Sequence, residues 1–91
     1  MAEIVISDQF NRKALKFLKS QPELVEKYKK TLLQLKLNPF HPSLRLHKLQ
    51  GNLQDFYSVS INMKYRILLN FIIQDDQIIL LDIGNHDYLY R

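Results

Sequence analysis

Residues 56–70 read FYSVSINMKYRILLN, and the pattern of this stretch decides the fold class. Apolar and polar side chains alternate from Tyr57 to Asn62, which is typical of a β-strand with one buried face. From Lys64 to Ile73 the chain is apolar on both faces, as in a central strand. The stretch therefore predicts two antiparallel strands joined by a tight connection.

The length of that connection sets the register of the hairpin. A connection of three residues, Asn62-Met63-Lys64, pairs Ser60 with Arg66 and keeps one face apolar throughout. The positions on this face are Tyr57, Val59, Ile61, Tyr65, Ile67 and Leu69. A two-residue loop would place Arg66 among them, so the three-residue connection is preferred. Ser58, Ser60 and Arg66 are then expected on the opposite face.

Two helices are predicted in the first half of the chain, after a short strand at residues 3–7. Ser7 or Asp8 caps the first helix, and its apolar stripe consists of Phe10, Ala14, Phe17 and Leu18. The second helix opens with a capping box at residues 20–23 and runs to about Leu37. Its buried face comprises Leu24, Tyr28, Thr31, Leu32 and Leu35. Leu33 and Leu37 lie off that face, either as plain surface leucines or as part of a groove for another chain.

The remaining segments complete the expected fold. Two prolines in residues 38–42 end the second helix, and a basic connector follows over residues 43–53. After a turn at residues 74–76, the last strand covers residues 77–83, with Ile79, Leu81 and Ile83 toward the core. The expected fold is α+β, a single domain spanning residues 1–91 in the order β-α-α-β-β-β. Two N-terminal helices pack on one face of a twisted antiparallel sheet of about four strands.

Composition narrows the classes of function. The 91 residues include no cysteine, so disulfides and thiolate chemistry are excluded. The first residues lack the basic segment and the long apolar segment of a signal peptide. No run is long enough to span a membrane, because Asn70 and Gln74 interrupt the longest apolar stretches. A cytoplasmic location is therefore expected. Residues 1–50 contain ten Lys and Arg against four Asp and Glu, a net charge of +6, whereas residues 51–91 carry −2. This basic first half suggests an acidic or polyanionic partner, although solvated helix faces explain it equally well.

The polar residues favour RNA cleavage without a metal. His41, His47 and His86 lack the close spacing of metal ligands, so no metal and no other cofactor are expected. Cleavage through the 2′-hydroxyl of RNA needs a proton acceptor, a proton donor and cations around the phosphate. The candidates for these roles are Arg45, His47 and Lys48 in the connector, Lys64 and Arg66 in the hairpin, and His86 and Tyr90 in the tail.

Three short motifs resemble one family. These are His47-Lys48-Leu49-Gln50-Gly51, Tyr65-Arg66, and the tail from Gly84 to Tyr90, which reads GNHDYLY. Their order and spacing resemble the RelE/ParE superfamily of toxins from toxin–antitoxin systems, and the resemblance spans the whole chain. It implies a toxin held inactive by a cognate antitoxin, which is expected to be a short acidic protein. The RelE-like members are ribosome-dependent endoribonucleases that cut mRNA, so mRNA and the ribosome are expected partners.

The resemblance also implies roles for individual residues. His86 and Tyr90 match the tail residues of catalytic members, and the step of four between them is that of the YafQ-like branch. His47, four residues before Gly51, matches a functional histidine of that branch, whereas Arg66 matches a phosphate-contacting arginine of the RelE-like branch. We therefore expect His86 to act as acid or base, Tyr90 to stack on a base, and Arg66 to hold the phosphate. The RNA backbone would be contacted by His47 together with Arg45, Lys48 and Lys64.

One departure leaves alternatives open. Active members usually carry a basic or proton-carrying residue on the strand occupied here by Ser58 and Ser60. The chain could therefore be a ParE-like inhibitor of DNA gyrase without enzymatic activity, or a member that only binds. Retention of His86 and Tyr90 favours the endoribonuclease, and this hypothesis expects both side chains to converge with Arg66.

Overall fold

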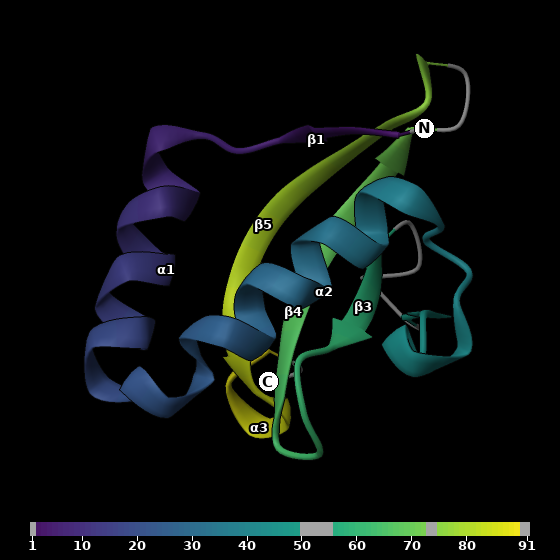
Figure 1. Ribbon diagram of the computed structural model, residues 1–91. Helices are drawn as coiled ribbons and strands as arrows, with labels where there is room; N and C mark the ends of the chain where they lie inside the picture. The colour runs from purple at the N-terminus through teal and green to yellow at the C-terminus, as the bar shows by residue number, and fades with distance from the viewer. Residues whose placement is uncertain (1, 50–55, 73–74, 90–91) are drawn as a thin grey trace.

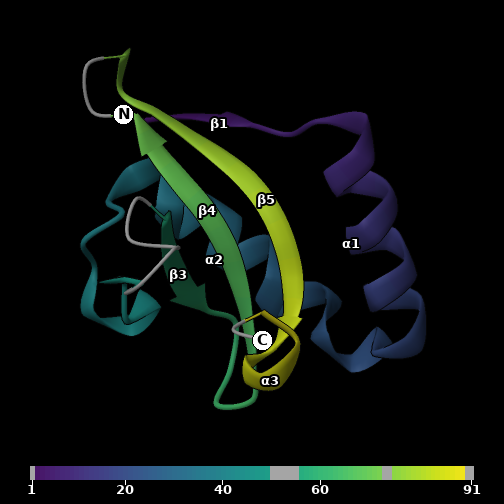
Figure 2. The same ribbon diagram turned by 180° about the vertical axis from the view of Figure 1, so that it is seen from behind.

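The computed structural model describes residues 2–49, 56–72 and 75–89, with the side chain of His86 excepted. In these ranges five strands form one sheet in the order β1-β5-β4-β3-β2. The elements, in chain order, are β1 Glu3–Val5, α1 Asp8–Ser20, η1 Pro22–Leu24, α2 Val25–Leu37, η2 Pro42–Leu44, β2 His47–Lys48, β3 Phe56–Ser60, β4 Tyr65–Ile72, β5 Gln77–Asn85 and α3 His86–Leu89. Figure 1 shows α2 crossing the front of the sheet and α1 packed beside β5. The opposite, open face is seen in Figure 2, with α3 at the end of β5.

The central hairpin has the register that the sequence predicts. Ser60 pairs with Arg66, and the Ile61 amide donates to the Tyr65 carbonyl over 2.9 Å. The side-chain oxygen of Asn62 closes the turn by accepting hydrogen bonds from the amides of Lys64 and Tyr65, at 2.9 and 2.8 Å. The apolar face packs into the core against α1 and α2. The most deeply buried residues of this core include Phe10, Leu35, Val59, Ile67 and Leu69.

The predicted inward face of β5 is wrong for two of its three residues. Ile78 and Leu80 are buried instead of Ile79 and Leu81, whereas Ile83 is buried as expected. The reason is a bulge. Leu68 pairs with Asp82 but Leu69 pairs with Leu80, so Leu81 is an extra residue in β5. A bulge moves every residue beyond it to the other face of the strand.

The sheet contains more than the four antiparallel strands expected. β1 is parallel to β5, with Glu3 opposite Gln77 and Val5 opposite Ile79, so the sheet is mixed. β2 comprises only His47 and Lys48, which pair with Ser58 and Tyr57 of β3. Two residues are too few for alternation to be recognised in a sequence. The α+β class and the two N-terminal helices are confirmed.

The helix boundaries are set by local hydrogen bonds. The Ser7 hydroxyl oxygen accepts a hydrogen bond from the Phe10 amide at 3.0 Å, and this confirms the predicted cap of α1. The capping box predicted at residues 20–23 is wrong, because Ser20 is the last residue of α1 and its hydroxyl donates to the Phe17 carbonyl at 2.8 Å. The 3-10 turn η1 follows, and α2 begins at Val25.

The C-terminal segment was expected to leave the sheet at Gly84. Instead, β5 continues through Gly84 and Asn85, which pair with Arg66 and Tyr65. The short helix α3 follows, with Leu89 buried at 6% exposure. None of the helices in the described ranges has the length and apolar character needed to cross a membrane.

Candidate functional site

Side chains from three adjacent strands meet on the open face of the sheet. His47 lies on β2, Ser58 on β3 and Arg66 on β4. The Arg66 Nε donates to the Ser58 hydroxyl oxygen at 3.0 Å, and Arg66 Nη2 lies 3.1 Å from His47 Nδ1. The same Nη2 donates to the Arg45 carbonyl at 3.0 Å. We call His47, Ser58, Arg66 and the Arg45 carbonyl the open-face cluster.

The contact with Arg66 assigns a tautomer to His47. A guanidinium has only donors, so Nδ1 must present its lone pair to Arg66, and the imidazole proton resides on Nε2. Nε2 points toward the Ser58 hydroxyl at 3.5 Å. His47 Nδ1 is also 3.3 Å from the Arg45 carbonyl, which accepts a hydrogen bond only when Nδ1 carries a proton. Nδ1 therefore accepts from Arg66 when it carries no proton, and it can donate to the Arg45 carbonyl when it carries one.

The Arg45 carbonyl is aimed by an unusual backbone conformation. Arg45 ends η2 with φ 49° and ψ 48°, in the left-handed region that side chains disfavour. Such a conformation costs on the order of 1 kcal/mol or more and persists where the surroundings hold it. Here the Arg45 amide donates to the Pro42 carbonyl at 3.2 Å, and the Arg45 carbonyl accepts a hydrogen bond from Arg66. The Arg45 side chain extends to the hairpin turn, where Nη1 lies 3.6 Å from the Met63 sulfur.

Burial divides the cluster into a fixed part and an accessible part. Ser58 is fully buried, Arg66 is half-buried, and His47 is exposed. Ser58 thus holds the Nε side of the guanidinium from within the sheet. The His47 residue is the exposed part of the cluster.

Two of the expected RNA contacts lie apart from this cluster. Lys48 pairs with Tyr57, whose ring packs against the core, so Lys48 faces away from His47. Lys64 lies in the hairpin turn with its Nζ 5.2 Å from the centre of the Tyr65 ring. Both lysines are exposed, but the register brings neither of them beside Arg66.

The tail histidine begins α3 close to the cluster. Gly84 pairs with Arg66, and His86 follows two residues later. The His86 side chain and all of Tyr90 lie outside the described residues. Their convergence with Arg66 therefore stays a prediction.

Close packing fixes the start of α3. The Asn85 side-chain oxygen accepts from the Tyr88 amide at 2.8 Å. The Tyr88 ring lies against Gly84, where an added Cβ would be 2.7 Å from Tyr88 Cδ2. From the sequence, Gly84 and Asn85 are expected to break the last strand and to belong to the tail motif, with no packing role. Their spacing from Tyr88 is the signal that could have identified them as the anchor of the tail.

Two further members of the cluster were predicted only in part. Ser58 was expected on the same face as Arg66 but without a role at the site, and Arg45 was expected to act through its side chain. Because Ser60 pairs with Arg66 in the predicted register, Ser58 lies two positions along the same strand and on the same face. This register is the signal that could have identified Ser58 as a neighbour of Arg66. The Arg45 carbonyl could not be found, because a positive φ at arginine has no sequence signature. Among the residues that the structure describes, no group of three His, Cys, Asp or Glu could hold a metal.

Comparisons with known proteins place this geometry in context. A family profile described as the bacterial toxin of type II toxin–antitoxin systems, YafQ, matches residues 2–91. YafQ from Escherichia coli strain BL21(DE3) superposes with a TM-score of 0.79 at 17% identity, over 100% of both chains. YafQ in the E. coli DinJ–YafQ toxin–antitoxin complex gives 0.77 at 17% identity, over 99% of this chain and 98% of that one. A metal-bound toxin from Helicobacter pylori gives 0.76 at 24% identity, over 99% and 100%. A search of curated proteins finds no match.

Proposed function

Because this chain belongs to the YafQ family of bacterial toxins of type II toxin–antitoxin systems, we propose that it is an endoribonuclease that cleaves mRNA on the ribosome. The observation that carries the proposal is the contact of Arg66 with His47 on the open face, at 3.1 Å. It joins a cation suited to a phosphate with an imidazole suited to proton transfer. Neither group is sealed beneath the helices.

Phosphate binding at Arg66 would activate His47. A phosphate oxygen is a stronger acceptor for a guanidinium than a neutral imidazole or a carbonyl. When the scissile phosphate takes Arg66 Nη2, the lone pair of His47 Nδ1 is released for the 2′-hydroxyl. Protonated Nδ1 can then donate to the Arg45 carbonyl, now 3.3 Å away. The same carbonyl that holds Arg66 before binding thus stabilises the imidazolium afterwards.

The reaction is an internal transfer of the phosphoryl group. The 2′-oxygen forms a bond to phosphorus as His47 takes its proton, and the bond from phosphorus to the 5′-oxygen breaks. His86 gives a proton to that leaving oxygen, and Tyr90 stacks on a neighbouring base. The products are a 2′,3′-cyclic phosphate and a 5′-hydroxyl, and no metal or other cofactor takes part.

Ser58 takes a positioning role in this scheme. Its hydroxyl oxygen accepts from Arg66 Nε at 3.0 Å from a fully buried position. The serine that departs from the family pattern therefore orients the phosphate-binding guanidinium instead of transferring a proton. His47, on the adjacent strand, supplies the proton acceptor.

The proposed partners follow from the family. E. coli YafQ forms a complex with DinJ, and we propose that a short acidic antitoxin neutralises this chain in the same manner. The substrate is mRNA in the ribosome, which places the protein in the cytoplasm. Arg45 and Lys64 at the hairpin turn, and Lys48 on the other face, are available for contacts with the RNA backbone or the ribosome.

Primer extension on cellular mRNA after induced expression tests the activity. Wild type should produce discrete cuts, and His47→Ala and His86→Ala should abolish them while both variants remain folded by circular dichroism. His41→Asn is the matched control, since it keeps a side-chain acceptor for the Ser43 amide at an exposed histidine away from Arg66. Intact mRNA together with an induced DNA-damage response would contradict the nuclease proposal and support inhibition of DNA gyrase instead. No effect on growth would leave a binding-only protein.

A further inference from the structure

The last part of β5 has a free edge. Among the described residues β1 pairs only with Gln77–Ile79, so residues 80–85 have a strand neighbour, β4, on one side alone. The Ile83 amide donates to the Asp82 carboxylate at 2.9 Å. Lys13 of α1 lies 3.7 Å from the same carboxylate and balances its charge. The remainder of the edge, from Ile83 onward, forms one wall of a cleft.

This cleft has a volume of about 290 Å³ and lies between the free edge and the end of α1. It is formed where α3 follows β5, at the end of the sheet seen in Figure 2. Its inner wall is aromatic, because the half-buried rings of Phe17 and Tyr65 meet edge to face with their centres 4.9 Å apart. Gln21 after α1, Asn85 on β5 and Tyr88 on α3 also line it. The cleft thus combines aromatic rings with side-chain amides.

Tyr88 connects the cleft with the open-face cluster. Gly84 pairs with Arg66, so the two residues point to the same face of the sheet. The Tyr88 ring lies against Gly84 on that face and also lines the cleft, and Tyr88 is 40% exposed. Facing residues on neighbouring strands are only about 5 Å apart. An RNA strand with one phosphate on Arg66 can therefore reach Tyr88 with a nucleotide close to that phosphate.

The chemistry of the cleft fits a base of single-stranded RNA. An unpaired base stacks on aromatic side chains and offers its edge for hydrogen bonds. Gln21 presents both a donor and an acceptor to such an edge. The Asn85 side-chain oxygen accepts from the Tyr88 amide, which leaves the Asn85 side-chain nitrogen to donate. Lys64, with its Nζ 5.2 Å from the centre of the Tyr65 ring, brings a cation for the RNA backbone.

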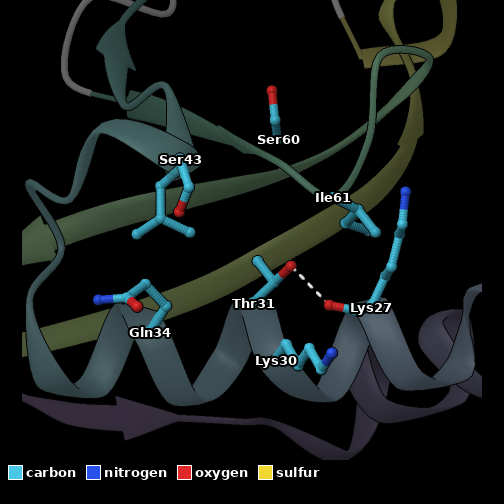
Figure 3. A pocket seen from close by; sticks show the side chains of 8 residues that line it. Lys27, Lys30, Thr31, Gln34, Ser43, Ser60 and Ile61 are labelled. Atoms are coloured by element: carbon cyan, nitrogen blue, oxygen red, sulfur yellow. Dashed lines mark hydrogen bonds between the residues drawn. The ribbon is translucent and has the colours of Figure 1, made fainter.

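A second cavity, between α2 and β3, lacks this combination (Figure 3). Its volume is about 310 Å³, and α2 lines it with Lys27, Lys30 and Gln34. None of the residues that line it is aromatic. In Figure 3 the Ser60 hydroxyl points away from α2, so the cavity lies on the helix side of the sheet and not beside Arg66. It is polar and cationic but cannot stack a base, and its residues serve as controls.

We propose that the cleft between α1, β5 and α3 binds one base of the substrate RNA close to the scissile phosphate. The base stacks on Tyr88, its edge is read by Gln21 and Asn85, and Lys64 binds the backbone beside it. The inference rests on the proposed function, in which Arg66 holds the scissile phosphate and Tyr90 stacks on a different base. Tyr88 and Gln21 then help to determine which sites in a message are cut.

A pair of RNA strands measures what the bases contribute to binding. The first is a fluorescein-labelled 2′-O-methyl RNA of about six nucleotides, which binds but is not cut because its 2′-oxygens carry no proton. The second has the same backbone with every base removed. Fluorescence anisotropy with the full chain should show that the first strand binds more tightly, by about tenfold or more. Equal affinities would overturn the proposal, because charge alone would then hold the RNA.

Matched variants locate the contribution of the bases. Tyr88→Leu should weaken binding of the intact strand by roughly fivefold or more and leave the abasic strand unchanged, whereas Tyr88→Phe should bind both strands as wild type does. Phe40→Leu is the control, because Phe40 is 70% exposed and stacks on Phe71 at the other end of β4. Lys64→Gln should weaken both strands alike. Circular dichroism verifies that each variant is folded. Equal losses for Phe40→Leu and Tyr88→Leu would overturn the assignment to the cleft.

Cleavage in cells identifies the strand that supplies the base. Sequencing of RNA 5′ ends should show that Tyr88→Leu and Gln21→Ala still cut but at a changed set of sites. Gln34→Ala, at a half-buried glutamine of the second cavity, should keep the wild-type sites. An equal loss at every site would assign the base to ribosomal RNA and overturn the assignment to the substrate.

The two arms also separate this inference from the proposed function, because binding of the 2′-O-methyl strands does not require cleavage. Tighter binding of the intact strand by wild type, lost in Tyr88→Leu, would support the cleft as a site for a base. Intact cellular mRNA in the same experiment would contradict the nuclease without affecting that result.

Discussion

Arg66 Nη2 lies 3.1 Å from Nδ1 of His47, so the guanidinium occupies the lone pair that the imidazole needs in order to accept a proton. In this state the histidine is blocked by its own neighbour. Under the proposed function, a bound phosphate would remove the block, because it would compete for the same guanidinium nitrogen. Phosphate binding and activation of His47 as a base would then be coupled through this one nitrogen atom.

Arg66→Gln should reduce mRNA cleavage by about a hundredfold or more, because a preorganised charge on the phosphate is lost. Arg66 is half-buried at the edge of the core, so the variant should unfold in urea close to the wild-type midpoint. Lys16→Gln, at an exposed position of α1, removes one positive charge without touching the cluster or a proposed RNA contact. If both variants lost activity equally, net charge and not the Arg66 contact would control cleavage.

Ser58→Ala should lower cleavage by roughly tenfold, since the guanidinium loses a hydrogen bond of about 1 kcal/mol or more that fixes its orientation. The substrate-binding step should suffer less than turnover, because the charge remains. Ser60→Ala is the matched control on the same strand and face, with 9% exposure. Single-turnover cleavage of a programmed ribosome, followed over substrate concentration, distinguishes the two effects. An unchanged rate for Ser58→Ala would remove the positioning role.

Gly84→Ala should destabilise the tail by about 1–3 kcal/mol, because its Cβ would meet the Tyr88 ring. The clash distance is 2.7 Å to Tyr88 Cδ2. In a Tyr88→Ala background the same change should cost less than about 0.5 kcal/mol, which a double-mutant cycle in urea can measure. Additive costs would mean that Gly84 is required for another reason. Cleavage by Gly84→Ala should fall as well, because α3 carries His86.

Alkaline stability should depend on Tyr28. Burial raises the pKa of the Tyr28 hydroxyl above its ordinary value of 10.0. Above that value the folded protein keeps a proton that the unfolded chain loses, so the free energy of unfolding falls as pH rises. Urea unfolding at about pH 9 and about pH 11 should show a smaller fall for Tyr28→Phe than for wild type. Tyr88→Phe serves as the control substitution, because Tyr88 is 40% exposed.

The register of the hairpin could be predicted because it follows from the alternation of the hairpin's own residues. Alternation from Tyr57 to Ile61 and the polar pair Ser60 and Arg66 allow one register, and the fold has that register. The same reasoning failed on β5, because continuous alternation assumes that no residue is extra. Leu81 is extra, and nothing in the run of isoleucine and leucine distinguishes a bulged strand from a regular one.

The site was predictable in part for a related reason. Facing residues follow from register, so the sequence alone predicts that Ser58, Ser60 and Arg66 share the open face. The contact with His47 depends on a two-residue strand and on the left-handed backbone of Arg45, both of which are imposed by packing from outside the segment. Such tertiary constraints leave no periodic trace in the sequence.

The parallel pairing of β1 with β5 has a consequence for folding. Val5 pairs with Ile79, which is 74 residues further along the chain. Contacts between residues so far apart form slowly, because closing the long loop between them costs conformational entropy. The antiparallel pairs β3–β4 and β4–β5 join segments that are close in the sequence. We therefore expect the hairpins to form first and β1 to complete the edge of the sheet last.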